Sequence, residues 1–191
     1  QNKKLVIESQ NKKINDSINY AKKIQDTLLP PIELISDRLS DVFIFHKPKA
    51  KVSGDFYWFK KLNDDTSIIA CVDCIGQGVL GGFMSTMGSV LLDKLTEHEG
   101  ISTSAILGGL NDEIIKILQQ TDTGQIQEGL GISVCKIEHI NAKIEFSGAR
   151  NGIVIINEGK AERFRSDLFP VGGNYAKSGS QIERKYNTQL I

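Results

Sequence analysis

The sequence S-I-I-A-C-V-D-C-I-G-Q-G-V-L-G-G-F-M-S, residues 67–85, runs from an apolar segment through a glycine-rich turn into a helical pattern. The apolar run is typical of a strand, and this strand ends at Asp73. Gly76 and Gly78 follow, and glycine allows both a tight turn and a close approach of neighbouring backbone. The stretch therefore predicts a strand, a turn and a helix, with a carboxylate at the strand end.

A second acidic residue lies eighteen positions upstream, in V-S-G-D-F-Y-W-F, residues 52–59. Asp55 is held there between Gly54 and an aromatic run that reads as another strand. Carboxylate oxygens are the ligands that hard divalent cations prefer. Asp55 and Asp73 together therefore suggest a site for such a metal.

The rest of the chain predicts strands on either side of two helices. We expect strands at 42–46, 56–60, 67–72, 132–138, 143–147 and 153–157, helices at 82–97 and from Ser102 or Ser104 to about 119, and hairpin turns at 139–141 and 158–159. Phe83, Met84 and Met87 are expected in the core. This order favours an α+β fold with largely antiparallel sheets over a doubly wound parallel sheet.

Residues 1–29 are polar and free of glycine, and they read as one helix that stops at Pro30 and Pro31. A narrow apolar seam recurs every seven residues, at Ile7, Ile14, Ala21 and Leu28, with Ile18 beside it. Asn11 and Gln25 interrupt the seam, so two readings stay open: pairing with a second copy, or packing on the chain's own domain. We expect residues 1–30 to form a signalling or dimerisation helix and residues 31–191 a globular domain.

Composition excludes several classes of protein. Lysine and arginine total 23 and acidic residues total 23, so the net charge is zero and no basic surface points to nucleic acid. No apolar run is long enough to span a membrane and no secretion signal is present, which favours a cytoplasmic protein. Because the chain begins at Gln1, we expect an upstream sensor module in the same polypeptide.

The cysteines and histidines do not form a recognisable site. C-V-D-C, residues 71–74, matches half a zinc knuckle or a redox pair, but no second pair completes it. Buried, inert thiols are the better interpretation of Cys71, Cys74 and Cys135. The histidines are scattered singly and are expected to be ordinary surface or core residues, at positions 46, 98 and 139.

The turn at residues 76–81 also fits the dinucleotide pattern G-x-G-x-x-G. The next element after its helix is another helix, and no strand-ending acid follows at the distance that a ribose requires. The dinucleotide interpretation therefore fails on context. A purely structural turn remains an alternative to a metal site.

Five ordered blocks resemble the PPM-type metal-dependent protein serine/threonine phosphatases, in their bacterial SpoIIE-like branch. The blocks are S-I-N-Y-A-K-K-I-Q-D-T-L-L-P (17–30), V-S-G-D-F-Y-W-F (52–59), D-C-I-G-Q-G-V-L-G-G-F-M-S (73–85), L-N-D-E-I (110–114) and S-G-A-R-N-G (147–152). The resemblance implies two antiparallel sheets sandwiched between helical layers.

The resemblance also implies an activity. The domain would remove phosphate from phosphoserine or phosphothreonine in a bacterial regulatory protein, with two Mn²⁺ or Mg²⁺ ions as cofactors. By this resemblance Asp55 and Asp73 bridge the two ions, and the main-chain carbonyl of Cys74 adds a ligand. The implied substrate is a small phosphoprotein of the anti-sigma-factor antagonist type. No covalent enzyme intermediate is required.

The chain departs from the family pattern at three positions and at its end. Gln77 stands where relatives often carry histidine, Leu80 where they carry proline, and Gly131 where they carry an acid. The chain ends at Ile191, where relatives continue into a T-D-G-like motif and further acidic ligands, so we expect a truncated domain. A degenerate phosphatase-like module that binds a partner without catalysis is the alternative function.

Overall fold

The computed structural model of the chain describes residues 2–98, 100–120, 127–173 and 184–191. Helices and strands follow in the order α1 (Asn2–Asp26), α2 (Ile32–Ser36), β1 (Phe56–Lys61), β2 (Thr66–Cys74), α3 (Val79–Leu95), α4 (Thr103–Ile117), β3 (Gly129–Glu138), β4 (Lys143–Ala149), β5 (Ile153–Asn157), β6 (Lys160–Phe164), β7 (Val171–Gly172) and β8 (Gln189–Leu190). The predicted order of strands, two helices and strands is confirmed.

The main sheet has six strands, in the order β1-β2-β3-β4-β8, with β7 pairing to the end of β3. A separate hairpin, β5-β6, forms the second sheet, and every pairing between named strands is antiparallel. The register of β2 on β3 sets Asp73 directly opposite Gly131. The α+β class with largely antiparallel sheets is thereby confirmed.

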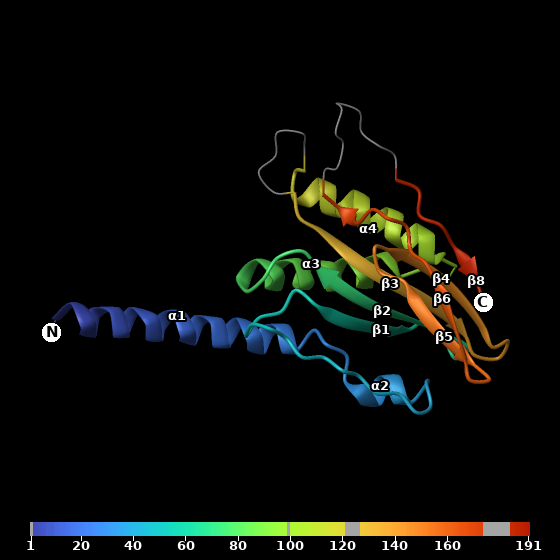
Figure 1. Ribbon diagram of the computed structural model, residues 1–191, viewed down its shortest axis with the longest axis horizontal. Coiled ribbons are helices and arrows are strands. Elements are labelled where there is room, and N and C mark those ends of the chain that lie inside the picture. The colour runs from blue at the N-terminus through green and yellow to red at the C-terminus, as the bar shows by residue number, and fades with distance from the viewer. Residues whose placement is uncertain (1, 99, 121–126, 174–183) are drawn as a thin grey trace.

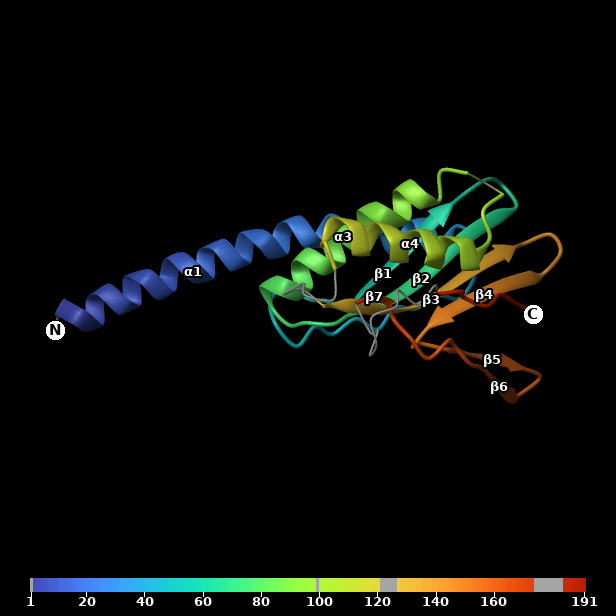
Figure 2. The same ribbon diagram turned by 90° about the horizontal axis from the view of Figure 1, so that it is seen from above.

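Helices α3 and α4 cover one face of the main sheet, as the view from above shows (Figure 2). Alternate strand residues point toward them, because successive side chains in a strand face opposite sides. The buried core joins the two helices to β1, β2 and β3, and it includes Phe56, Trp58, Ile68, Ala70, Val72, Met84, Leu92, Ile106, Leu110, Leu130 and Ile132.

The opposite face of β2 is more open, with Ile69 half-buried and Cys71 and Asp73 exposed. Residues 42–46 lie along this face, and the strand predicted there is wrong. The segment is extended, but it pairs with no strand of the described chain. It therefore lacks the backbone hydrogen bonds between neighbouring chains that define a β-strand. Its side chains alternate, with Phe43 and Phe45 86% and 84% exposed.

The two central helices agree with the sequence except at one side chain. Ser102 caps α4, since its hydroxyl accepts a hydrogen bond from the Ala105 amide at 3.2 Å. In α3 Met84 is buried and Met87 packs against the core as predicted. Phe83 was expected in the core but is 72% exposed. It lies on the side of α3 that faces away from the sheet.

Helix α1 projects from the body of the molecule, with the amino terminus at its far end (Figure 1). Leu5, Ile7 and Ile14 are more than half exposed, whereas Gln25 in the last turn is buried. The helix therefore contacts its own domain through its carboxy-terminal part. Within the described residues, no helix is both long enough and apolar enough to span a membrane.

Candidate functional site

Asp73 is the second-last residue of β2 and points away from the α3–α4 layer. Its neighbours Val72 and Cys74 are buried in the core, while Asp73 itself is exposed, as strand alternation requires. Residues on one face of β2 thus pack against the helical layer. The carboxylate is left on the other face, at the strand end.

Asp55 immediately precedes β1 and is held through its backbone. Its amide donates to the Ser53 hydroxyl at 3.0 Å, and its carbonyl oxygen lies 3.0 Å from Nε2 of His46. The His46 ring meets Tyr57 edge-on, with ring centroids 6.0 Å apart. These contacts fix the backbone at residue 55 and leave the carboxylate free to point into the site.

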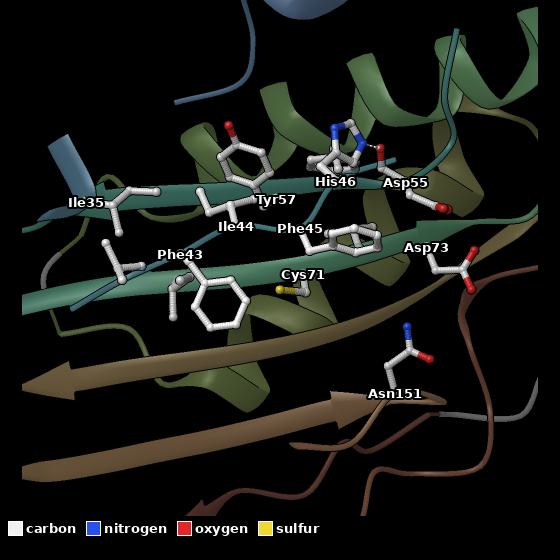
Figure 3. Close-up of a pocket in the computed structure, with 14 residues that line it drawn as sticks. Ile35, Phe43, Ile44, Phe45, His46, Asp55, Tyr57, Cys71, Asp73 and Asn151 are labelled. Carbon is white, nitrogen blue, oxygen red and sulfur yellow. Dashed lines mark hydrogen bonds between the residues drawn. The ribbon is translucent and has the colours of Figure 1, made fainter. Parts of the chain in front are cut away.

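The two carboxylates lie between two adjoining cavities, of about 300 and 400 Å³. The smaller one is bordered by the glycine-rich loops, and every candidate residue taken from the sequence lines it: Gly54, Asp55, Asp73, Cys74, Gly76 and Gly78. The larger one is an apolar cleft on the open face of the sheet, where Figure 3 shows both carboxylates at one end. The structure thus brings together residues that are eighteen positions apart.

Electrostatics at the site favour a cation. Burial, the negative charge of Asp73 and a hydrogen-bonding contact with its side chain raise the pKa of Asp55 above the ordinary value of 3.8, although the charge of His46 opposes the shift. Two carboxylates that repel each other in this way are the arrangement that a bound cation relieves. The oxygen donors here suit Mg²⁺ or Mn²⁺.

Glycines bring the two acidic loops and α3 into backbone contact. A Cβ on Gly54 would lie 2.8 Å from the Cys74 carbonyl oxygen, and one on Gly81 would lie 2.8 Å from the Gly76 carbonyl oxygen and 2.9 Å from the Gly54 Cα. Real Cβ atoms do not approach so closely, so only glycine permits this packing. The Cys74 carbonyl is consequently held against the residue that precedes Asp55.

The turn between β2 and α3 needs glycine for a second reason. Gly76 has φ +119° and Gly78 has φ +64°, a region that residues with a Cβ rarely adopt. Gly78 caps α3 without a side-chain hydrogen bond. Gln77 lies between them and lines the smaller cavity.

Comparison with solved structures gives matches at low sequence identity. The SiaA-PP2C domain of Pseudomonas aeruginosa matches with a TM-score of 0.80 and 24% identity, over 95% of this chain and 68% of that one. The PP2C phosphatase domain of SpoIIE from Bacillus subtilis, solved with a fragment of its regulatory domain, matches with a TM-score of 0.54 and 22% identity. RsbX in complex with magnesium matches with a TM-score of 0.54 and 18% identity.

The chain has the PP2C phosphatase fold. The matches to SpoIIE and RsbX each cover 73% of this chain, but only 37% and 60% of those chains, so this chain spans less than two thirds of either. No sequence model of a protein family matches the chain, and no curated protein matches it in sequence. The fold implied by the five sequence blocks is confirmed.

Four residues beside the two carboxylates were not singled out as site residues in the sequence. Gln25 and His46 bind the backbone at Ser53 and Asp55, Lys49 lines the smaller cavity, and Asn151 lines the larger one. Gln25 and Asn151 carried a signal, because they belong to the blocks at 17–30 and 147–152. The others depend on contacts between segments that are distant in the sequence.

The cysteines agree with the sequence interpretation in part. All three are free; Cys74 is buried, and burial raises the pKa of the Cys135 thiol to about 12. Cys71 was expected to be buried, but it is exposed on the open face of β2. Cys71 and Cys74 are three residues apart on one strand and so point to opposite faces, which excludes the redox pair.

Proposed function

We propose that this chain is a metal-dependent phosphatase domain that removes phosphate from phosphoserine or phosphothreonine in a regulatory protein. The observation that carries the proposal is the meeting of Asp55, just before β1, and Asp73, at the end of β2, at one cavity of a PP2C fold. The glycine-rich loops beside them open a space of about 300 Å³, in which a phosphorylated side chain can approach the carboxylates.

Two divalent cations, Mn²⁺ or Mg²⁺, fit this donor set. Asp55 and Asp73 provide carboxylate oxygens, and the Cys74 carbonyl, held against Gly54, provides a neutral one. When bound, such ions lower the pKa of a water ligand and neutralise charge on the phosphoryl group. RsbX, which shares the fold, is described in complex with magnesium.

The chain's own residues orient the reactants. The hydrogen bond that the Asp55 amide donates to Ser53 and the contact of its carbonyl with His46 fix the backbone of Asp55, so its carboxylate does not need to reorganise. Lys49 is the basic side chain in the described lining of the smaller cavity, and its ammonium group attracts a phosphate dianion there. Gln77 can hydrogen-bond at this site but cannot exchange a proton near neutral pH.

The partners form part of the proposal. We infer that the substrate is a phosphoprotein of the anti-sigma-factor antagonist type in the cytoplasm, and that residues 1–30 relay a signal from an upstream sensor module. Exposure of Ile7 and Ile14 on the projecting α1 supports a homodimer through this helix. SpoIIE, which shares the fold, is described with a fragment of its regulatory domain.

A regulatory module that binds a partner without catalysis is the second candidate. Residues 2–98, 100–120, 127–173 and 184–191 contain no group of three Asp, Glu, His or Cys side chains that could hold a metal ion. A site with two carboxylates binds divalent cations more weakly than one with four. This candidate predicts phosphoprotein binding without turnover.

Hydrolysis of a phosphoserine peptide by the purified chain separates the two functions. We expect turnover that requires Mn²⁺, is abolished by a chelator, and is lost in Asp55→Asn and Asp73→Asn while the circular dichroism spectrum stays unchanged. Asp64→Asn is the matched control, because this carboxylate lies in the exposed β1–β2 turn. Equal turnover in the Asp73→Asn variant would refute the site, and absence of turnover in the wild type would favour the binding module.

A further inference from the structure

Gly131 has no side chain at the position on β3 that lies opposite Asp73. Gly131 on β3 is the register partner of Asp73 on β2. Directly opposite residues of an antiparallel pair have Cβ atoms about 5 Å apart, on the same face of the sheet. A side chain at position 131 would therefore stand next to the Asp73 carboxylate.

The carboxamide of Asn151 occupies that space. A Cβ on Gly131 would lie 2.9 Å from Nδ2, 3.2 Å from Cγ and 3.2 Å from Oδ1 of Asn151. Figure 3 shows the Asn151 side chain below Asp73, at the end of the cleft where the carboxylates lie. A residue from the segment after β4 thus takes the place of the missing cross-strand side chain.

Backbone contacts hold Asn151 in this position. The Ser133 hydroxyl on β3 donates to the Asn151 carbonyl oxygen at 2.8 Å. The preceding residue, Arg150, has φ +63° and pairs with Ile132 through an isolated bridge. The turn is therefore fixed to the two residues of β3 that follow Gly131, and the Asn151 side chain that it delivers is half-buried.

The lining of the larger cleft is short of hydrogen-bond donors for a phosphoryl group, whose oxygens only accept, because Lys49 lines the smaller cavity. His46 is engaged with the Asp55 carbonyl, and the Tyr57 hydroxyl donates to the Pro30 carbonyl at 3.3 Å. Among the described residues, the side-chain amide of Asn151 has no hydrogen-bond partner. Its N–H groups are the ones left to face a bound ligand.

We propose that Asn151 is a substrate-binding residue, whose side-chain amide donates a hydrogen bond to an oxygen of the phosphoryl group held beside Asp73. Gly131 is its counterpart, since the absence of a side chain there makes room for the amide. This inference rests on the proposed phosphatase function, and it assigns to Asn151 a contact with the substrate rather than with a cation.

Three variants test the assignment. Asn151→Leu keeps the size of the side chain and removes the donor, Asn151→Asp replaces the donor with a negative charge, and Gly131→Ala pushes the amide out of its place. Asn157→Leu, at the exposed end of β5, is the matched control. Thermal unfolding of each variant shows whether it is folded.

The measurements are the KM and kcat for a phosphoserine peptide, the Kd for inorganic phosphate in the presence of Mg²⁺, and the Kd for Mn²⁺ alone, the last two by calorimetry. Asn151→Leu and Gly131→Ala should raise the KM and the phosphate Kd about tenfold, the effect of one hydrogen bond to a charged group. The Mn²⁺ Kd should stay within twofold. Asn151→Asp should weaken phosphate binding further while tightening Mn²⁺ binding.

A phosphate Kd within twofold of the wild type in Asn151→Leu would overturn the inference, as would an Mn²⁺ Kd that rises in step with the phosphate Kd. Phosphate binding that is undetectable in the wild type would also overturn it. If the wild type binds phosphate but does not hydrolyse the peptide, the proposed function fails while the phosphate Kd values still decide the role of Asn151.

Discussion

Gln25 on the last turn of α1 binds both backbone groups of Ser53, two residues before Asp55. The Ser53 amide donates to Gln25 Oε1 at 2.9 Å, and Gln25 Nε2 donates to the Ser53 carbonyl at 2.6 Å. Gln25 Nε2 also lies 2.6 Å from the Ser85 hydroxyl on α3. One buried amide thus ties the amino-terminal helix to the Asp55 loop and to the helix that follows Asp73.

Gln25→Leu preserves volume and removes these hydrogen bonds. The Ser53 carbonyl keeps the hydrogen bond that the Ser85 hydroxyl donates at 3.1 Å, but the buried Ser53 amide loses its acceptor. Leaving this amide unpaired should lower the free energy of unfolding by about 2 kcal/mol. Loss of the link should also weaken Mn²⁺ binding severalfold, since the Asp55 loop is no longer fixed. Urea unfolding and Mn²⁺ calorimetry measure the two effects.

Lys22→Ala is the control for Gln25→Leu. Lys22 lies about one turn before Gln25 on the same helix and forms an exposed ion pair with Asp26. Exposed pairs of this kind contribute about 0.5 kcal/mol or less. Equal destabilisation by the two substitutions would contradict the role assigned to Gln25.

The raised pKa of Asp55 predicts a pH-dependent stability in the absence of metal. The folded state binds the proton more tightly than the unfolded state, whose carboxyl has its ordinary pKa near 3.8. The contribution of Asp55 to the free energy of unfolding is therefore largest at low pH and falls as pH rises from about 3.8 through the raised value. Asp55→Asn should remove this fall.

In a chelator at pH 7, Asp55→Asn should consequently unfold at higher urea concentration than the wild type. Saturating Mn²⁺ should reverse the order, because the wild type gains binding free energy that the variant lacks. A variant less stable than the wild type in the chelator would show that the two carboxylates do not repel each other.

Backbone packing at Gly81 predicts a contrast between two glycines in helices. Gly81→Ala places a Cβ against the Gly76 carbonyl and the Gly54 Cα, so it should destabilise the chain by about 2 kcal/mol. Gly108→Ala, in α4, meets nothing within 4 Å and should stabilise by up to about 1 kcal/mol through helix propensity. Denaturant unfolding of both variants decides whether close packing or propensity governs position 81.

Exposure of the apolar seam predicts dimerisation through α1. The double variant Ile7→Asp, Ile14→Asp should be monomeric by light scattering at concentrations where the wild type is a dimer, because charge in a buried seam is unfavourable. Lys13→Asp, on the same exposed part of the helix, should stay dimeric. A wild type that remains monomeric over a wide concentration range would disprove the dimer.

Local sequence signals predicted the main elements of the fold correctly. The apolar run before Asp73 specifies β2, the serine at 102 starts α4, and Glu158 and Gly159, with φ +48° and +76°, form the predicted hairpin turn. Features that depend on partners distant in the sequence were missed. Residues 42–46 have strand character but no strand to pair with, and the short strands β7 and β8 exist only through β3 and β4.

The sequence predicted the site residues that local patterns mark and missed those that depend on distant contacts. Glycines next to the two aspartates indicated close packing of the loops, and the distances at Gly54 explain why. Nothing in the sequence around Gln25 or Asn151 shows which backbone or cleft it will meet. Helical periodicity also placed Phe83 in the core, although the sheet covers the other side of α3 and leaves this ring exposed.

Anomalous diffraction from crystals of the chain grown with Mn²⁺ tests the central claim most directly. The account predicts manganese peaks between the carboxylates of Asp55 and Asp73, with the Cys74 carbonyl among the ligands, and no peak there in Asp73→Asn crystals. Fully occupied manganese at other positions, with none between Asp55 and Asp73, would contradict it.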